Sequence, residues 1–155
     1  MMKWLQIHAL IASQFLFAQS ILFQDVTLHV QTPKQSHIEI NSPQINTCKT
    51  NNLCLKAPVI FFQDKNKTWK IEAYSGEINP QSGSFKADHI SINPPGWWNA
   101  TAQSIELSSE QQLLSLYNPT MKVKHFEITS PRATAFLRSE NLIISGPWKM
   151  TMDKS

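Results

Sequence analysis

Two cysteines are the residues of this chain whose type and spacing most directly suggest chemistry. Cys48 and Cys54 are its only cysteines, and the polar sequence Lys-Thr-Asn-Asn-Leu lies between them. Such a segment is typical of a hairpin tip, so we expect the two thiols to form a disulfide in an oxidising compartment. Metal binding is the alternative, but two thiols with no histidine nearby fall short of the ligand set that zinc takes. We therefore predict neither a metal site nor a cofactor.

The other reactive side chains are scattered along the sequence. His29, His37, His89 and His125 each stand alone within a segment of alternating polarity, where a surface histidine is commoner than a metal ligand. Asp88 and His89 are adjacent, so in a strand they would project from opposite faces and could not act together. The glycines show no phosphate-binding spacing, and the Gly-x-Ser-x-Gly and His-Glu-x-x-His motifs do not occur. The sequence therefore predicts that the protein is not an enzyme.

The N-terminal segment indicates where the chain is sent. No charged residue occurs from Trp4 to Phe23, and Lys3 precedes this run, as in an export signal or a membrane anchor. About 20 apolar residues would just span a bilayer, but glutamines and a histidine interrupt the run. Ala18-Gln19-Ser20 fits the small-x-small rule for cleavage, which slightly favours a cleaved signal. We expect residues 1–22 to be a signal peptide or membrane anchor and residues 23–155 to form an exported domain.

Length and charge narrow the class of protein further. The chain has 155 residues, of which 41% are hydrophobic, enough for the core of one domain. Its net charge is only +3, and the basic residues are spread among 11 acidic ones. Because nucleic-acid binding needs a concentrated basic surface, we predict no nucleic-acid partner.

Alternation of apolar and polar residues dominates the chain and predicts strands with one buried face. Turn sequences separate the alternating segments, and Asn79-Pro80-Gln81-Ser82-Gly83 is the clearest of them. The alternation shifts by one residue at His89, which predicts a β-bulge. The apolar faces in the first half are predicted to contain Val26, Leu28 and Val30; Ile38 and Ile40; Leu55, Ala57, Val59 and Phe61; Trp69, Ile71 and Ala73; and Phe85, Ala87, Ile90 and Ile92.

Three of the strands are entered through a proline. Their sequences begin Ala57-Pro58-Val59, Asn118-Pro119-Thr120 and Gly146-Pro147-Trp148. We interpret this recurrence as strands that return in two sheets of one fold. The last of them, which ends at Met152, is predicted to be the terminal edge strand.

Several short segments follow one another in a characteristic order. They are Leu55-Lys56-Ala57-Pro58-Val59-Ile60-Phe61-Phe62, Thr68-Trp69-Lys70-Ile71-Glu72-Ala73, Thr101-Ala102-Gln103-Ser104-Ile105-Glu106-Leu107 and Leu113-Leu114-Ser115-Leu116-Tyr117-Asn118. Their order resembles that of the LptC family, the periplasmic component of the lipopolysaccharide export transporter, over roughly residues 22–152. The resemblance implies an all-β fold, a twisted half-open β-jellyroll in which two antiparallel sheets form a V after the N-terminal apolar segment.

The resemblance also implies a function and its site. The protein would bind the acyl chains of lipopolysaccharide in an apolar groove and pass them from the inner-membrane transporter to the periplasmic bridge. We expect the lipid-binding residues to be Val26, Leu28, Val59, Phe61, Trp69, Ile71, Ile105, Leu116, Met121 and Phe126.

Partners follow from the same resemblance. Edge strands would join the jellyroll to the membrane subunits of the transporter at one end and to an LptA-like protein at the other. Trp148, Met150 and Met152 would form the partner edge at the C-terminal end. The protein would lie on the periplasmic side of the inner membrane, anchored there if the N-terminal segment is retained.

Two alternatives remain open. One is an exported structural β-protein with a closed core. The other is an LptA-type bridge protein that has no inner-membrane anchor.

Overall fold

Antiparallel strands make up nearly all of the structure. The computed structural model describes residues 5–10, 22–31, 37–48, 51–96, 98–108, 112–139 and 141–152, and no α-helix lies among them. The expected all-β class is therefore confirmed. The strands are β1 (Leu5–Leu10), β2 (Leu22–Gln31), β3 (His37–Thr47), β4 (Leu53–Lys56), β5 (Val59–Asp64), β6 (Lys67–Ile78), β7 (Phe85–Asn93), β8 (Trp98–Ser108), β9 (Leu113–Tyr117), β10 (Thr120–Val123), β11 (Phe126–Thr129), β12 (Arg132–Phe136), β13 (Leu142–Ser145) and β14 (Lys149–Met152).

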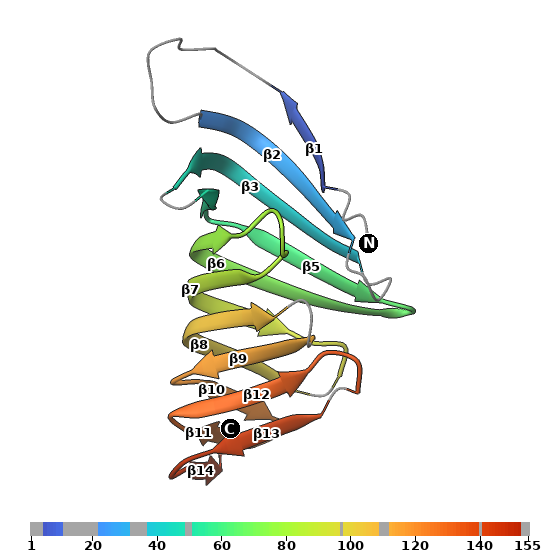
Figure 1. The fold of residues 1–155 in the computed structure, drawn as a ribbon. Helices are drawn as coiled ribbons and strands as arrows, with labels where there is room; N and C mark the ends of the chain where they lie inside the picture. The colour runs from blue at the N-terminus through green and yellow to red at the C-terminus, as the bar shows by residue number, and fades with distance from the viewer. Residues whose placement is uncertain are drawn as a thin grey trace.

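One continuous sheet is folded along a line into two arms (Figure 1). We call the arm that contains β5, β10, β11 and β14 the β5 arm, and the arm that contains β4, β9, β12 and β13 the β4 arm. The long strands belong to both: β3 pairs with β5 through His37–Asn41 and with β4 through Gln44–Thr47. Strand β6 does the same through Lys67–Glu72 and Ser75–Ile78. The result is the pair of antiparallel layers expected for a half-open jellyroll.

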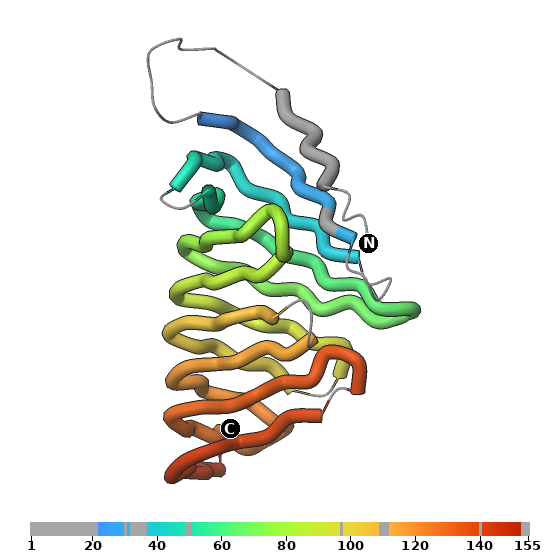
Figure 2. Tube along the Cα trace, viewed as in Figure 1, coloured from blue at the N-terminus to red at the C-terminus, as the bar shows by residue number. Residues whose placement is uncertain are grey.

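The chain therefore advances as a stack of bent rungs. Figure 2 shows the rungs following one another from β2 to the C-terminal end, each turning on the same side of the molecule. We call the row of turning residues the bend line. Successive rungs are hydrogen-bonded across it: Ala57 N–H donates to Tyr74 O at 2.9 Å, and Asn118 N–H donates to Pro131 O at 2.8 Å.

The direction of each crossing decides its backbone conformation. Strands that run from the β4 arm to the β5 arm cross the bend line at a residue in the left-handed region. Those residues are Asp25 (φ 51°), Ala57 (φ 42°), His89 (φ 51°), Asn118 (φ 50°) and Gly146 (φ 83°). Among the described residues, the return crossings near Pro43, Tyr74, Gln103 and Pro131 have no positive φ. At the first four of these residues the alternation of inward and outward side chains changes phase, although the pairing across Asp25 and His89 stays one residue to one.

The proline-led strands all begin at these crossings. Pro58 and Pro119 directly follow the left-handed residues Ala57 and Asn118, and both prolines are buried. Proline donates no backbone hydrogen bond, so it fits where the ladder is interrupted. The strands that they lead, β5, β10 and β14, all lie in the β5 arm, so the interpretation that proline-led strands return in two layers is wrong.

The change of phase predicted at His89 is confirmed, but it is not the expected β-bulge. Ala87 and Ile90 are both buried, while Asp88 and His89 between them are exposed. Asp88 and Ile90 pair with Ser75 and Ala73 of β6 and with Ser104 and Ala102 of β8, so one residue stands opposite His89 on each side and no extra residue is inserted. The shift keeps apolar residues on the inner face in both arms.

One predicted face is wrong by one residue. Leu55 is buried as expected, but beyond it Ile60 and Phe62 point into the core, while Val59 and Phe61 are half-buried on the other face. The left-handed crossing at Ala57 causes the change of phase, just as His89 does in β7. Strict alternation across Ala57 could not anticipate it.

The expected disulfide is confirmed. Cys48 and Cys54 are joined at the tip between β3 and β4, with a Cα–Cα distance of 5.6 Å. The Cys48 N–H donates to Asn52 O at 2.8 Å, which closes the turn beside the covalent bond. The bond thus pins one hairpin of the β4 arm.

Strand β2 begins at Leu22, the last residue of the predicted N-terminal segment 1–22. Before it, Leu5–Leu10 forms β1, which pairs with β2, while residues 1–4 and 11–21 lie outside the described part. In the parts of the chain that the structure describes, no helix is long and apolar enough to cross a membrane. The role of residues 1–22 as a signal or anchor stays a prediction.

Candidate functional site

The inner faces of the two arms meet in an apolar seam. Side chains of the β5 arm, such as Ile60 and Met121, are buried, and so are those of the β4 arm, such as Leu55 and Leu116. Among the described residues, the buried polar side chains are only Ser42, Gln112 and Ser130. None of these three side chains titrates near neutral pH, so the buried residues described in the seam supply no acid or base.

Two tryptophans of the β5 arm, near the starts of β6 and β8, meet in the core. The rings of Trp69 and Trp98 meet edge to face, with centroids 5.8 Å apart. Trp69 is fully buried, yet its Nε1 has no hydrogen-bond partner among the residues that the structure describes. An unpaired buried donor costs about 1–3 kcal/mol. The seam thus holds one polar atom that a bound acceptor could satisfy.

The seam opens towards solvent at its C-terminal end. Met121 of β10 pairs with Ile128 of β11, and Ile128 pairs with Met150 of β14, so the three side chains share the inner face. Met121 is fully buried, Ile128 is half-buried and Met150 is 49% exposed. Exposure therefore rises strand by strand along one apolar row.

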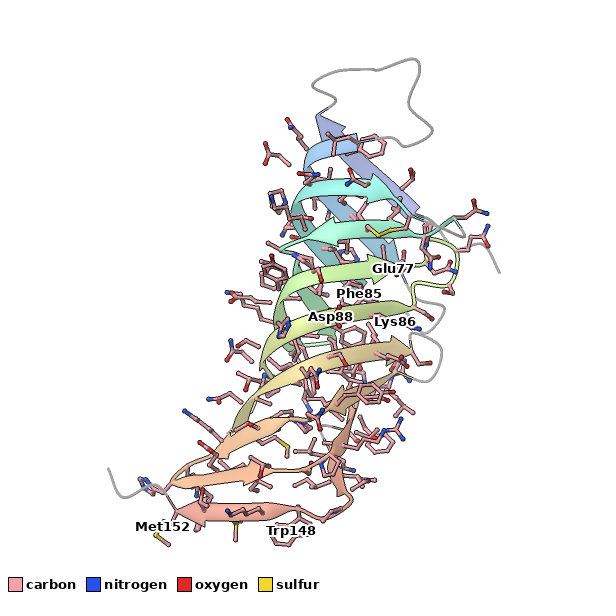
Figure 3. The ribbon with its side chains drawn as sticks, turned by 90° about the vertical axis from the view of Figure 1, so that its left-hand side faces the viewer. Glu77, Phe85, Lys86, Asp88, Trp148 and Met152 are labelled. Carbon is pink, nitrogen blue, oxygen red and sulfur yellow. A yellow bond between two sulfur atoms is a disulfide. The ribbon has the colours of Figure 1, made fainter. Side chains whose placement is uncertain are left out.

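A second row on the same arm repeats the trend. Val123, Phe126 and Met152 pair across β10, β11 and β14, and Met152 is 65% exposed. Figure 3 shows Trp148 and Met152 projecting from the last strand, at the end of the molecule. We call the exposed residues Phe126, Trp148, Met150 and Met152 the apolar rim.

The β4 arm completes the opening. Ile144 and Leu142 of β13 pair with the buried Ala133 and Ala135 of β12, and both are only half-buried. Within the described residues, β13 pairs only with β12 and β14 only with β11. Both arms thus end in an open strand edge beside the apolar rim.

The predicted lipid-binding residues divide into three groups. Phe126 lies on the rim, and Val59 and Phe61 face away from the seam, where Ile60 and Phe62 stand instead. The sequence prediction missed Ile60 and Phe62 because it continued the same alternation of buried and exposed residues through Ala57. The remaining candidates are buried in the seam: Val26, Leu28, Trp69, Ile71, Ile105, Leu116 and Met121.

The partner edge predicted from Trp148, Met150 and Met152 coincides geometrically with β14 and the residue before it. Its hydrogen-bonding edge and its apolar side chains are both exposed. Whether a partner binds there is untested and remains a prediction.

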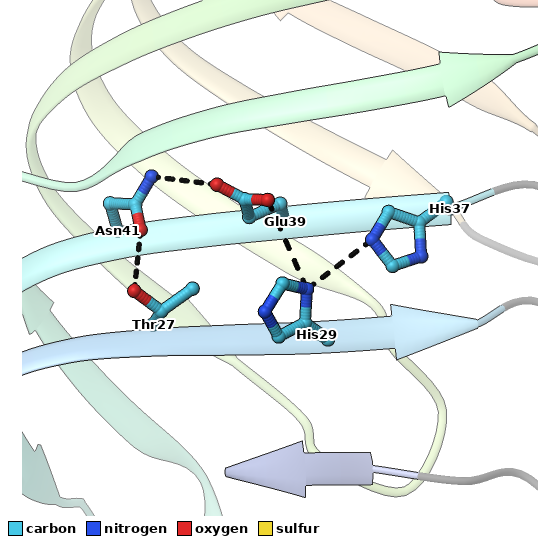
Figure 4. A network of polar contacts seen from close by, with 5 residues as sticks. All are labelled: Thr27, His29, His37, Glu39 and Asn41. Carbon is cyan, nitrogen blue, oxygen red and sulfur yellow. Dashed lines mark hydrogen bonds and ion pairs between the residues drawn. The ribbon is translucent and has the colours of Figure 1, made fainter. Parts of the chain in front are cut away.

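A polar cluster lies on the outer face of the β5 arm, and sequence reasoning missed it. The register of β2 and β3 pairs His29 with Glu39 and Gln31 with His37, which places the two histidines diagonally across the hairpin. His29 Nδ1 lies 3.3 Å from His37 Nε2 and 3.9 Å from Glu39 Oε2 (Figure 4). Pairing the predicted hairpin residue by residue would have revealed this proximity.

The fold defines a class of bent, all-β proteins with an apolar seam, and comparisons with known proteins add little to it. No protein-family model matches the sequence, and neither does any curated protein. Among solved structures, the chain aligns with LptH, the LptA-homologous periplasmic component of the lipopolysaccharide transport device of Pseudomonas aeruginosa. The alignment has 7% identity and a TM-score of 0.34, and covers 96% of this chain and 94% of LptH. So loose a match supports no inference about function.

Proposed function

We propose that this chain is a non-enzymatic, periplasmic component of lipopolysaccharide export that binds lipid acyl chains at the open end of its seam. One observation carries the proposal: the apolar inner face passes without interruption from buried Met121 to exposed Met150. Contiguous exposed apolar surface marks an interaction site in soluble domains. The sequence resemblance to the LptC family supports lipopolysaccharide as the lipid.

The seam suits acyl chains by its chemistry. Each buried methylene of an acyl chain contributes about 0.8 kcal/mol, so a dry apolar cleft suffices and no catalytic group is required. Trp69 Nε1, which has no partner in the closed seam, could donate to an ester carbonyl of the lipid. Transport would then be passive transfer along aligned seams, driven by an energy source elsewhere.

Entry of lipid would require the two arms to separate beyond the rim. Ile105, Leu114 and Leu116 are fully buried, so acyl chains could reach them only if the arms part. The open end requires less rearrangement, because Met150 and Leu142 already face solvent in part. We therefore propose that lipid first contacts the rim and then extends between the arms.

Two features bear on the partner and on the type of component, LptC-like or LptA-like: the open strand edges and the N-terminal segment. We propose that β14 and β13 offer their open edges to an LptA-like partner, so that the apolar faces of the two proteins become continuous. Retention of residues 1–22 would make the protein an LptC-type component at the inner membrane. Their removal would make it an LptA-type bridge, and the mass of the mature N-terminus distinguishes the two.

Photo-crosslinking tests lipid contact directly. A photoreactive residue at Met150 should give a lipopolysaccharide adduct in cells that export lipopolysaccharide, because this side chain is on the rim. The same residue at Ile143, which is 51% exposed on the outer face of β13, is the matched control. Equal labelling at both positions, or no adduct at Met150, would contradict the proposal.

A second pair of positions tests the seam itself. Phe62 faces the seam and Phe61 faces outwards, although they are adjacent. If lipid passes between the arms, a photoreactive residue at Phe62 gives an adduct and one at Phe61 does not. Adducts at Met150 alone would restrict lipid to the rim.

Most side chains on the inner faces of the two arms are fully buried. This burial favours one other function, that of an exported structural β-protein with a permanently closed core. Binding of an apolar fluorescent dye separates the two. A lipid carrier should bind the dye, and Met150→Ser should weaken this binding about tenfold, since losing a buried methionine contact removes about 1.5 kcal/mol. A closed structural protein should bind no dye in either form.

A further inference from the structure

The cluster of His29, His37 and Glu39 has the geometry of a metal site. One ligand atom from each residue lies within 4.8 Å of the other two, and all three side chains are half-buried. They come from neighbouring strands of one hairpin, so their backbone positions are held by the β2–β3 ladder. The cluster lies on the outer face, away from the apolar seam.

The distance between the two imidazoles matches a shared cation. With metal–nitrogen bonds of about 2.0–2.1 Å, two ligands of a tetrahedral zinc ion stand about 3.3 Å apart. His29 Nδ1 and His37 Nε2 are 3.3 Å apart. Without a cation, the same distance allows one hydrogen bond between the rings, so the distance alone does not decide between the two.

The surroundings of Glu39 give an independent reason to favour a cation. Asn41 Nδ2 donates to Glu39 Oε1 at 3.0 Å, which leaves Oε2 as the oxygen facing His29. Thr27 Oγ1 donates to Asn41 Oδ1 at 2.8 Å and fixes the orientation of that amide. Metal-binding carboxylates are commonly oriented by outer hydrogen bonds of this kind. Figure 4 shows this chain of contacts running from Thr27 to the two histidines.

We propose that His29 Nδ1, His37 Nε2 and Glu39 Oε2 bind one divalent transition-metal ion, with Zn²⁺ as the best match. Imidazole nitrogens with one carboxylate suit zinc and related ions better than calcium or magnesium, which prefer all-oxygen shells. Glu39 Oε2 lies 3.9 Å from His29 Nδ1, so a small movement of the carboxylate brings the two atoms to the separation of about 3.3 Å that two zinc ligands have. The ion fastens β2 to β3 on the face opposite the seam, so it is a site separate from the proposed lipid function.

Zinc titration of the full chain, prepared without a histidine tag, tests the proposal. Calorimetry and native mass spectrometry should show one Zn²⁺ per chain. His29→Gln and His37→Gln should each weaken binding more than tenfold. Asn41→Ala keeps all three ligands and removes only the orienting amide, so it should weaken binding about tenfold.

Exposed histidines outside the cluster provide the controls. His89→Gln and His125→Gln should bind zinc like the natural sequence, because neither residue belongs to the cluster. Co²⁺ bound to the natural sequence should show the visible absorption of a low-coordinate site, and His37→Gln should abolish it. Circular dichroism confirms that each variant is folded.

Three results would overturn the site. They are the absence of zinc binding, equal binding by His37→Gln and the natural sequence, and one ion shared between two chains. The last result would assign zinc to a contact between copies.

Discussion

Met121 and Met150 face the same side of the sheet with only Ile128 between them, yet Met121 is fully buried and Met150 is 49% exposed. The two residues differ in their place in the stack: β10 lies between β8 and β11, whereas β14 pairs only with β11 among the described residues and is the last strand of its arm. A continuous apolar surface therefore leads from the closed interior to solvent. This relationship is the basis of the proposed lipid-binding end.

Which face of β5 is buried can be tested by comparing two adjacent phenylalanines. Phe62 is fully buried in the seam, so Phe62→Ala should lower the free energy of unfolding by about 3–5 kcal/mol. Phe61 is half-buried on the outer face, so Phe61→Ala should cost about 1 kcal/mol or less. Urea unfolding monitored by tryptophan fluorescence measures both values, and a larger loss for Phe61→Ala would show that the assigned phase is wrong.

The close packing of β6 against β7 predicts a strong effect of one added methyl group. A Cβ at Gly76 would lie 2.8 Å from Cζ of the buried Phe85 ring, so Gly76→Ala should destabilise the fold by about 1–3 kcal/mol. At Gly96 the nearest atom would be 4.0 Å away, and Gly96→Ala should change stability by about 0.5 kcal/mol at most.

A double-mutant cycle links the Gly76 effect to its cause. In a Phe85→Leu background the clashing ring is absent, so the further loss from Gly76→Ala should be smaller than in the natural sequence. Thermal or urea unfolding of the four proteins gives the coupling free energy. An additive result would mean that the Phe85 ring is not responsible.

The bend line predicts an unusual response at Ala57. Its φ of 42° is unfavourable for an L-residue by about 1–2 kcal/mol, whereas glycine adopts it freely. Ala57→Gly should therefore raise the melting temperature slightly, although the greater freedom of unfolded glycine offsets part of the gain. Ala57→Val should lower it, because a β-branched residue tolerates this conformation less well. Calorimetry measures both melting temperatures. A higher melting temperature for Ala57→Val than for Ala57→Gly would refute the left-handed conformation of Ala57.

The disulfide should stabilise the fold without being essential to it. It closes a loop with a sequence separation of 6, so replacing both Cys48 and Cys54 with serine should cost about 2 kcal/mol. Strand content in circular dichroism should remain, since the bond lies at one hairpin tip. A reducing agent should lower the urea midpoint of the natural protein to that of the double variant and leave the variant unchanged.

The local pattern of this sequence determined the all-β class, the disulfide and the change of phase at His89. These features depend on neighbouring residues: alternation follows from the two faces of a strand, and a short polar segment between cysteines forms a hairpin tip. The recurrent prolines also marked strand entries correctly. Each of these inferences needed only residues close together along the chain.

Other features depended on contacts that the sequence does not show. The left-handed conformation of Ala57 reversed the faces of Phe61 and Phe62, and nothing in the residue type of alanine announces a positive φ. The pairing register of β2 and β3 brought His29 beside His37, although each looked isolated in the sequence. The place of β10 inside the stack and of β14 at its end decided that Met121 is core and Met150 is surface, because burial depends on what packs against a side chain and not on the side chain alone.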